Sequence, residues 1–246
     1  MAVASEGQGA AVARLMGRDI SASELAPPAA DIKREKRAKT EAQFKEWLRD
    51  YPKDRLSGLI WESLRESFCK GRDCTATEKE IADFTATIDR RMRDDAGEWR
   101  QRLEQVRKEL KSGSHSKEKR KALEAEKRRL ETSVKNAPSN DDRAPDATDR
   151  KISHDIAKTC IEAWKFNRAL YRKYGGRAIF QQAGIEPIDA YRKFLEEHEA
   201  KRTFEISDPA LRREFWKYFT EMQHSYLDAK DVDFETPWWD MKVGKE

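Results

Sequence analysis

The sequence predicts an all-α, mostly helical protein with a minor β-sheet of two or three strands. Three observations predict this fold class. Apolar residues recur at the three- and four-residue spacing of amphipathic helices through most of the chain. Charged residues make up 39% of the 246 residues and hydrophobic residues only 37%, a balance that suits long solvent-facing helices around a small core. Two short segments, near residue 15 and near residue 180, instead have the composition of strands.

The first predicted element lies in residues 12–25, VARLMGRDISASEL, which we interpret as a strand, a turn, a second strand and a helix start. Ser21 or Ser23 would cap that helix. A short helix is expected over residues 41–51, followed by a longer amphipathic helix within residues 54–74. The longer helix carries one apolar stripe of Leu56, Leu59, Ile60, Leu64 and Phe68, with Trp61 beside it.

A long helical hairpin is predicted next. A capping box at Thr75 or Thr77 opens a helix that runs to about residue 111 with a heptad-like apolar seam. The KSGSHS turn then leads into a charged helix over residues 117–134. We assign residues 91–135 to a projecting antiparallel hairpin, and residues 136–150, which contain two prolines, to a linker.

The stretch YRKYGGRAIFQQAGIEP, residues 171–187, raises the question of a phosphate-binding loop. A Walker-type loop needs Gly-x-x-x-x-Gly-Lys-Ser/Thr after a strand, whereas Gly175 and Gly176 follow a predicted helix. Gly175 is therefore interpreted as a left-handed helix stop, and RAIFQQ as a strand. We expect residues 178–181 to pair with residues 12–16, because this would close one discontinuous domain.

The last part of the chain is predicted to contain two helices and a tail. Pro187 opens one helix, and Ser207 or Asp208 caps a second that continues to about residue 227. The predicted organisation is a flexible segment 1–11, a discontinuous domain of residues 12–90 and 151–227, the hairpin, the linker, and an acidic aromatic tail of residues 228–246. The tail sequence TPWWDM, with Trp238 and Trp239, is a candidate docking element that could equally fold back on its own chain.

The net charge of +4 arises from 50 basic and 46 acidic residues, so positive and negative charges are nearly balanced over the chain. The most basic stretch, residues 111–135, holds nine basic and four acidic residues. Its cations alternate with glutamates, as on a solvated helix face, and this pattern disfavours a nucleic-acid partner. No apolar run is long enough to cross a membrane.

Neither a cofactor nor a metal site is predicted. The four histidines lack the short spacing from a cysteine that zinc sites use, and no nucleophile stands beside a base, so no enzymatic activity is expected. Cys160 lies on an apolar helical face, where a thiol acts as a small hydrophobe. Cys69 and Cys74 flank a turn and could form a local disulfide in an oxidising compartment.

The N-terminal Ala2-Val3-Ala4 resembles the end of a signal-peptide cleavage site without its upstream apolar region. This similarity favours a periplasmic or secreted protein from which the signal peptide has been removed.

Two stretches together resemble the N-terminal chaperone module of the SurA and parvulin-type foldases. They are VARLMGRDISASEL and RLSGLIWESLRESFCKGRDCTATEKEIADF, and the likeness covers residues 12–90. The resemblance implies a mostly helical module with a small sheet that cradles extended client segments in the bacterial periplasm. The chain has no recognisable isomerase domain, so prolyl isomerase activity is not implied.

The sequence therefore predicts a non-catalytic chaperone, assembly factor or scaffold that binds a protein or an extended peptide segment through apolar surface between helices. The candidate partner-binding residues are aromatic: Trp61, Phe68, Phe84, Trp164, Trp238 and Trp239. Two alternatives stay open. One is a nucleic-acid-binding coiled-coil protein that uses residues 111–135, and the other is a hydrolase or effector whose site is assembled from dispersed residues such as His154 or His224.

Overall fold

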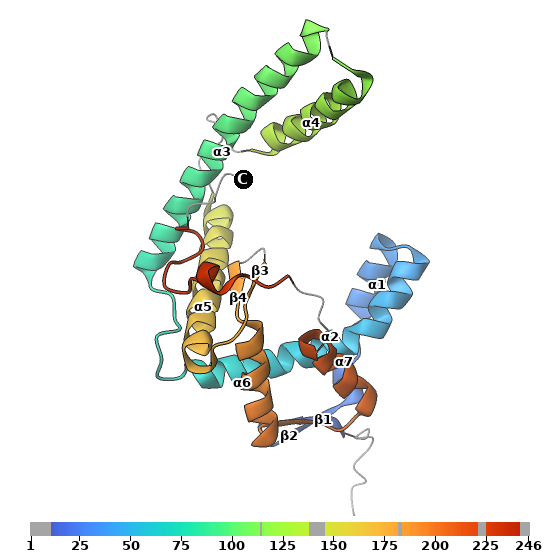
Figure 1. Cartoon of the computed structure of the whole chain (residues 1–246). Coiled ribbons are helices and arrows are strands. Elements are labelled where there is room, and N and C mark those ends of the chain that lie inside the picture. The colour runs from blue at the N-terminus through green and yellow to red at the C-terminus, as the bar shows by residue number, and fades with distance from the viewer. Residues whose placement is uncertain (1–10, 114, 138–145, 182–183, 221–224, 242–246) are drawn as a thin grey trace, which may run out of the picture. The chain divides into compact units, whose positions relative to one another are not determined.

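A computed structural model describes residues 11–113, 115–137, 146–181, 184–220 and 225–241 (Figure 1). Most of these residues are helical, and the strands form two small antiparallel sheets, so the predicted fold class is confirmed. None of the helices in these ranges combines the length and the apolar character needed to cross a bilayer.

The chain divides into two compact units. Unit 1 contains residues 1–74 and 163–236, and unit 2 contains residues 75–162 and 237–246. Unit 1 is therefore discontinuous, as is the domain expected from the sequence. Its boundaries differ from the expected ones, because residues 75–90 and 151–162 belong to unit 2.

The N-terminal strands of unit 1 form as the sequence predicts. β1 (Ala11–Leu15) and β2 (Arg18–Ser21) pair antiparallel, joined by a tight turn in which Met16 and Gly17 both have positive φ. Ser21 caps the short 3-10 helix Ala22–Leu25 through a capping box with Glu24.

The predicted partner of the strand near residue 180 is wrong. β3 (Ile179–Gln181) pairs with β4 (Gly184–Glu186), its neighbour in the chain, and not with residues 12–16. Gly184, with φ +103°, adopts a backbone conformation that other residues rarely take, and so permits this tight reversal. The free edge of β1 is instead occupied by β5 (Phe204–Ile206), which completes a three-stranded sheet in the order β2-β1-β5. A C-terminal strand thus does pair with β1, but it is a different strand.

The two helices predicted over residues 41–74 are one helix, α2 (Glu41–Cys69), which follows the short, exposed α1 (Ala29–Ala38). Pro52 lies inside this helix, although proline lacks the N–H that an interior helical position donates. The helix continues through Pro52 since its later turns bury four apolar side chains, each worth about 1.5–3 kcal/mol: Leu56, Ile60, Leu64 and Phe68.

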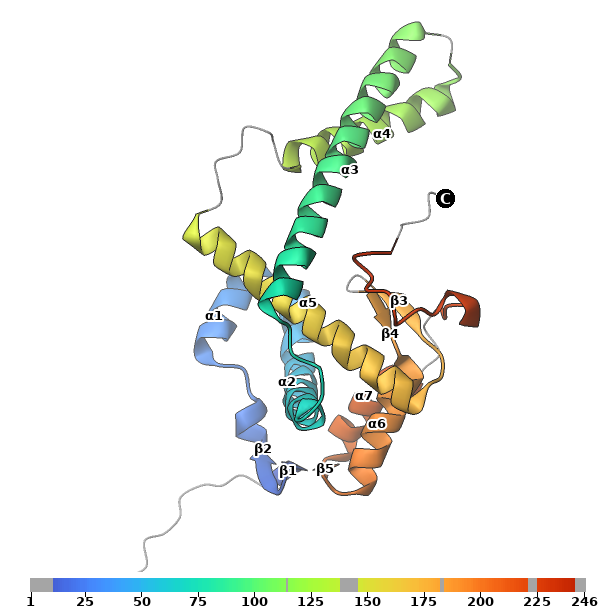
Figure 2. The same cartoon turned by 90° about the vertical axis from the view of Figure 1, so that its left-hand side faces the viewer.

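The core of unit 1 lies where the sheet, α2 and the C-terminal half of α5 (Ala147–Tyr174) meet α6 (Ile188–Ala200) and α7 (Pro209–Thr220). Figure 2 shows α6 and α7 side by side. Phe194 of α6 is fully buried, and its ring contacts those of Phe68 and Phe166. Asp208 caps α7 by accepting hydrogen bonds from the N–H groups of Ala210 and Leu211.

α7 ends at Thr220 and not near residue 227. Residues 221–224 lie outside the described part of the chain. Tyr226 is extended and forms an isolated β-bridge with Ile179, which is incompatible with a helix at this position.

The glycine stretch is a helix stop, as predicted. Gly175 follows α5 with φ +59°, and its N–H donates to the carbonyl of Tyr171. The carboxylate of Asp189 in α6 accepts from the backbone N–H of Arg177 at 2.8 Å and from its guanidinium at 3.0 Å. A carboxylate of the chain itself therefore occupies the loop, which excludes a phosphate cradle at this backbone N–H.

Unit 2 contains the predicted hairpin. α3 (Glu78–Ser112) begins with a capping box between Thr77 and Glu80, and Gly113, with φ +76°, ends it. α4 (Lys117–Asn136) returns alongside it (Figure 1). The two helices share a small apolar core of Leu103, Val106, Leu123 and Leu130, flanked by Trp99, Leu110 and Val134.

Candidate binding groove

A cavity of about 480 Å³ opens in unit 1 between α2, α5, α6 and α7. Five aromatic side chains form its walls: Trp61, Phe166, Tyr191, Tyr218 and Phe219. The Trp61 ring lies 5.1 Å from that of Tyr191 and 6.4 Å from that of Phe219, measured between centroids. Tyr218 is 46% exposed, so this aromatic wall is open to solvent on one side.

The floor of the cavity is polar and hydrogen-bonded. Asn167 is buried, and its Oδ1 accepts a 2.7 Å hydrogen bond from the hydroxyl of Tyr191 while its Nδ2 donates to the carbonyl of Ile185. Burial, together with the carboxylate of Glu186, raises the pKa of both Tyr191 and Tyr218. Both phenols therefore remain protonated at neutral pH and can act as hydrogen-bond donors.

A second cavity of about 550 Å³ shares Trp61, Tyr218 and Phe219 with the first, so the two meet at these aromatic rings. Its remaining lining is mostly charged, with three cations and three anions: Arg49, Lys53, Lys217, Asp50, Asp54 and Glu214. We call the two cavities together the Trp61 groove. One end is aromatic, and the other is polar with balanced charge.

Helix α2 provides one long wall of the groove because of its four-residue periodicity. Arg49, Lys53, Ser57, Trp61 and Arg65 recur every fourth position, so they form one row along the helix. The adjacent row, from Leu56 to Phe68, packs into the core. At 1.5 Å per residue the lining row is about 24 Å long, which accommodates roughly seven residues of an extended peptide.

Among the described residues that line the groove there is neither a histidine nor a cysteine. His154 lies in unit 2, where its ring is 3.4 Å from Glu78 and lines none of the cavities found, and His224 lies outside the described residues. Burial lowers the pKa of His198, which packs on Phe194. In the described ranges no cluster of three or more potential ligands could hold a metal ion.

The structure separates the six aromatic residues expected to contact a partner. Trp61 lines the groove. Trp164 is half-buried elsewhere in unit 1, with the guanidinium of Arg168 4.3 Å from its ring centroid, and lines neither cavity. Phe68 is buried in the core of unit 1. In unit 2, Phe84 is buried against Trp239, which is itself only 6% exposed, and it also contacts Trp238.

Residues 237–241 of the tail therefore fold back within unit 2, the second of the two outcomes left open for TPWWDM, whereas Phe234 stacks on Tyr171 in unit 1. A hydrogen bond from the Arg91 guanidinium to the carbonyl of Met241 also holds it there. Trp239 and Phe84 could contact a partner only after local rearrangement, because their own packing covers them.

The cysteines are thiols in this structure. Cys74 is buried and Cys69 is half-buried, and the disulfide between them stays a prediction. Cys160 is also half-buried, and burial raises the pKa of its thiol, as expected for a packing role. The cleavage-site similarity falls in residues 1–10, outside the described part of the chain.

Sequence reasoning missed Asn167, Arg65 and Tyr218 as parts of the groove. The four-residue row that contains Trp61 was visible in the sequence and could have indicated Arg65. The positions of Asn167 and Tyr218 depend on how α5 and α7 pack against α2, which no local pattern encodes.

Comparison with known proteins gave no match to any family model, curated protein or solved structure. The resemblance to the SurA-type chaperone module accordingly stays a prediction, carried by the two stretches quoted above.

Proposed function

We propose that this protein binds a partner protein by holding an extended segment of it in the Trp61 groove. The observation that carries the proposal is the continuity of the two cavities, which join at Trp61, Tyr218 and Phe219 along about 24 Å of α2. Clefts that combine aromatic walls with a few fixed polar groups are typical binding sites.

The two ends of the groove suit different parts of one segment. The aromatic end accepts an apolar side chain. The Tyr191 hydroxyl donates its proton to Asn167, so its oxygen can accept a hydrogen bond from a backbone N–H of the segment. The other end presents cations and anions in equal number and so favours polar or mixed-charge residues over a strongly charged tract. Such a ligand matches a chaperone, assembly factor or scaffold better than an enzyme substrate.

A panned library of seven-residue peptides, followed by fluorescence anisotropy with the selected sequences, tests this proposal. Tyr218→Ala removes an exposed ring that lines both cavities, and it should weaken the selected peptides about tenfold or more, in the range of an interface hot spot. Phe180→Ala is the matched control, because Phe180 is an exposed aromatic of unit 1, 59% accessible, that lines neither cavity.

The two tryptophans provide an internal comparison. Trp61→Ala should abolish binding, whereas Trp164→Ala should leave it within about twofold, since Trp164 lies outside the groove. Thermal unfolding of each variant shows whether a loss arises from the groove or from the core that Trp61 contacts. The proposal fails if no peptide is enriched, or if Phe180→Ala weakens binding as much as Tyr218→Ala.

A further inference from the structure

The distal part of the α3–α4 hairpin, residues 101–136, concentrates basic charge that the whole chain does not show. Residues 101–136 contain twelve lysines and arginines and six glutamates, a net charge of +6, against +4 for all 246 residues. The rest of the chain is therefore slightly acidic. A polyanion that approaches this protein is therefore attracted mainly to the hairpin.

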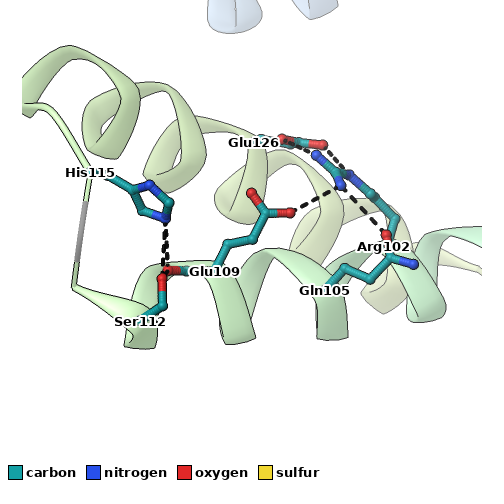
Figure 3. Close-up of polar contacts among 6 residues, drawn as sticks. All are labelled: Arg102, Gln105, Glu109, Ser112, His115 and Glu126. Atoms are coloured by element: carbon teal, nitrogen blue, oxygen red, sulfur yellow. Dashed lines mark hydrogen bonds and ion pairs between the residues drawn. The ribbon is translucent and has the colours of Figure 1, made fainter.

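The glutamates of the hairpin are largely neutralised by its own arginines and lysines. Figure 3 shows Arg102 of α3 between Glu126 of α4, at 2.8 Å, and Glu109 of its own helix, at 3.4 Å. The Arg102 guanidinium lowers the pKa of Glu126, which therefore stays ionised. Five of the six glutamates lie in such ion pairs: Glu104, Glu109, Glu124, Glu126 and Glu131.

This pairing changes how the alternating charges of the sequence are interpreted. Alternation suggests a face on which the two signs cancel everywhere. In the folded hairpin, Glu126 and Glu131 of α4 reach across to Arg102 and Arg107 of α3. Their charges are satisfied at the seam between the helices. Glu118 and Glu124 stay exposed on α4, where Glu124 pairs with Arg120, so the cations outnumber the anions on this surface.

Four of these cations form a row on α4. Lys117, Lys121, Arg128 and Lys135 follow one another at intervals of four, seven and seven residues, which places them within about 40° of one another around the helix. All four are exposed, on the side away from Leu123 and Leu130, and none forms an ion pair with another described residue. We call them the Lys117 stripe. It is about 27 Å long at 1.5 Å per residue.

We propose that the Lys117 stripe binds double-stranded nucleic acid through its phosphates, without reading the base sequence. A row of cations about 27 Å long is complementary in charge to a duplex, which carries one phosphate charge per about 1.7 Å of its axis. Among the described residues, the strongly exposed large apolar side chain on α3 and α4 is Met92, which lies outside residues 101–136, so the basic part of the hairpin offers no such side chain to stack on bases or to insert into a bilayer. Contacts from these cations to phosphate oxygens carry no sequence information, so a charge-driven contact is expected.

The proposal concerns unit 2 and does not depend on peptide binding in unit 1. Anisotropy of a labelled 30-base-pair duplex, measured at 50–200 mM salt, provides the test. Four phosphate contacts give a slope of about −3.6 in log K against log salt, so affinity should fall on the order of 100-fold over this range. Two duplexes of unrelated sequence should bind equally.

The decisive variant changes all four stripe residues to glutamine. Because these side chains are exposed and make no ion pair with a described residue, the fold should persist, and far-UV circular dichroism verifies this. Duplex affinity at 50 mM salt should fall at least tenfold, with a shallower salt slope. The matched control removes the same charge from exposed cations of unit 1 and should change affinity less than twofold: Lys33, Lys36, Arg37 and Arg55.

Several results would overturn the proposal. Equal losses in the two variants would mean that binding follows net charge and not the stripe. A salt-independent affinity, or no binding at 50 mM salt, would contradict the proposed contact with phosphates. Tighter binding to vesicles containing anionic phospholipid than to the duplex would assign the stripe to a membrane surface.

Discussion

Gly175→Ala and Gly176→Ala make the same chemical change at adjacent positions and should differ strongly in their effect on stability. Gly175 has φ +59°, in the left-handed helical region, and an added Cβ would meet no atom within 4 Å. Gly176 has φ +104°, and its Cβ would lie 2.4 Å from the Cβ of Asp189. Only the second substitution combines backbone strain with a steric clash.

The expected magnitudes follow from these two terms. An alanine in the left-handed region costs roughly 1–2 kcal/mol, partly offset by about 0.4–1 kcal/mol because alanine restricts the unfolded chain. At Gly176 the less accessible φ costs about 1–3 kcal/mol, and the clash adds about 1–3 kcal/mol because rotation about χ1 cannot move the Asp189 Cβ. The unfolded-chain term is the same at both positions and cancels, so we expect Gly176→Ala to be about 2.5 kcal/mol less stable than Gly175→Ala.

Urea denaturation followed by tryptophan fluorescence measures this difference directly. In thermal unfolding it corresponds to roughly 5–10 °C for a chain of this size. In an Asp189→Gly background the clash disappears, so the added cost of Gly176→Ala should shrink by about 1–3 kcal/mol. Equal stability of the two single variants would refute the contact between the glycine loop and the first turn of α6.

Two further predictions concern other parts of the chain. Leu130→Ala should destabilise the hairpin by about 2–5 kcal/mol, because Leu130 is buried in its small core. Hydrogen exchange over residues 117–136 measures this loss, and the exposed Arg128→Ala is the control. Equal protection from exchange in the two variants would contradict the prediction. Glu197→Gln should flatten the acid limb of the stability curve. Lys201, Tyr174 and Lys173 lower the pKa of Glu197 from 4.5 to about 2. The contribution of this carboxylate to folding stability is therefore complete above pH 4.5 and is lost as the pH falls towards 2. Urea denaturation between pH 2 and 6 measures this loss, and an unchanged dependence of stability on pH in the variant would contradict the prediction.

Local sequence patterns predicted most helices and their ends correctly. The capping box at Thr77, the left-handed stop at Gly175 and the cap at Asp208 each depend on atoms a few residues apart in the chain. The same dependence on local patterns explains why two helices were predicted where α2 is one helix that continues through Pro52. The local preference of proline for a helix start was outweighed by burial of the later turns of α2, and burial is a tertiary quantity.

The strand partners and the groove could not be predicted in this way. β5 is only three residues long, too short for an alternating pattern to reveal it, and it pairs with β1 nearly two hundred positions away. The row that lines the groove was present in α2, but Tyr218 and Asn167 join it only because α5 and α7 pack against that helix.

The sequence by itself determined which segments are helical, where most of them begin and end, and that the charge is mixed. Helical periodicity, caps and glycine stops act within one or two turns, so the order of residues is sufficient to encode them. The tertiary structure decided that β5 pairs with β1, that Trp239 is buried on Phe84, and that Glu126 and Glu131 of α4 pair with arginines of α3. Packing joins residues distant in the chain, and it alone determines which side chains remain exposed to a partner.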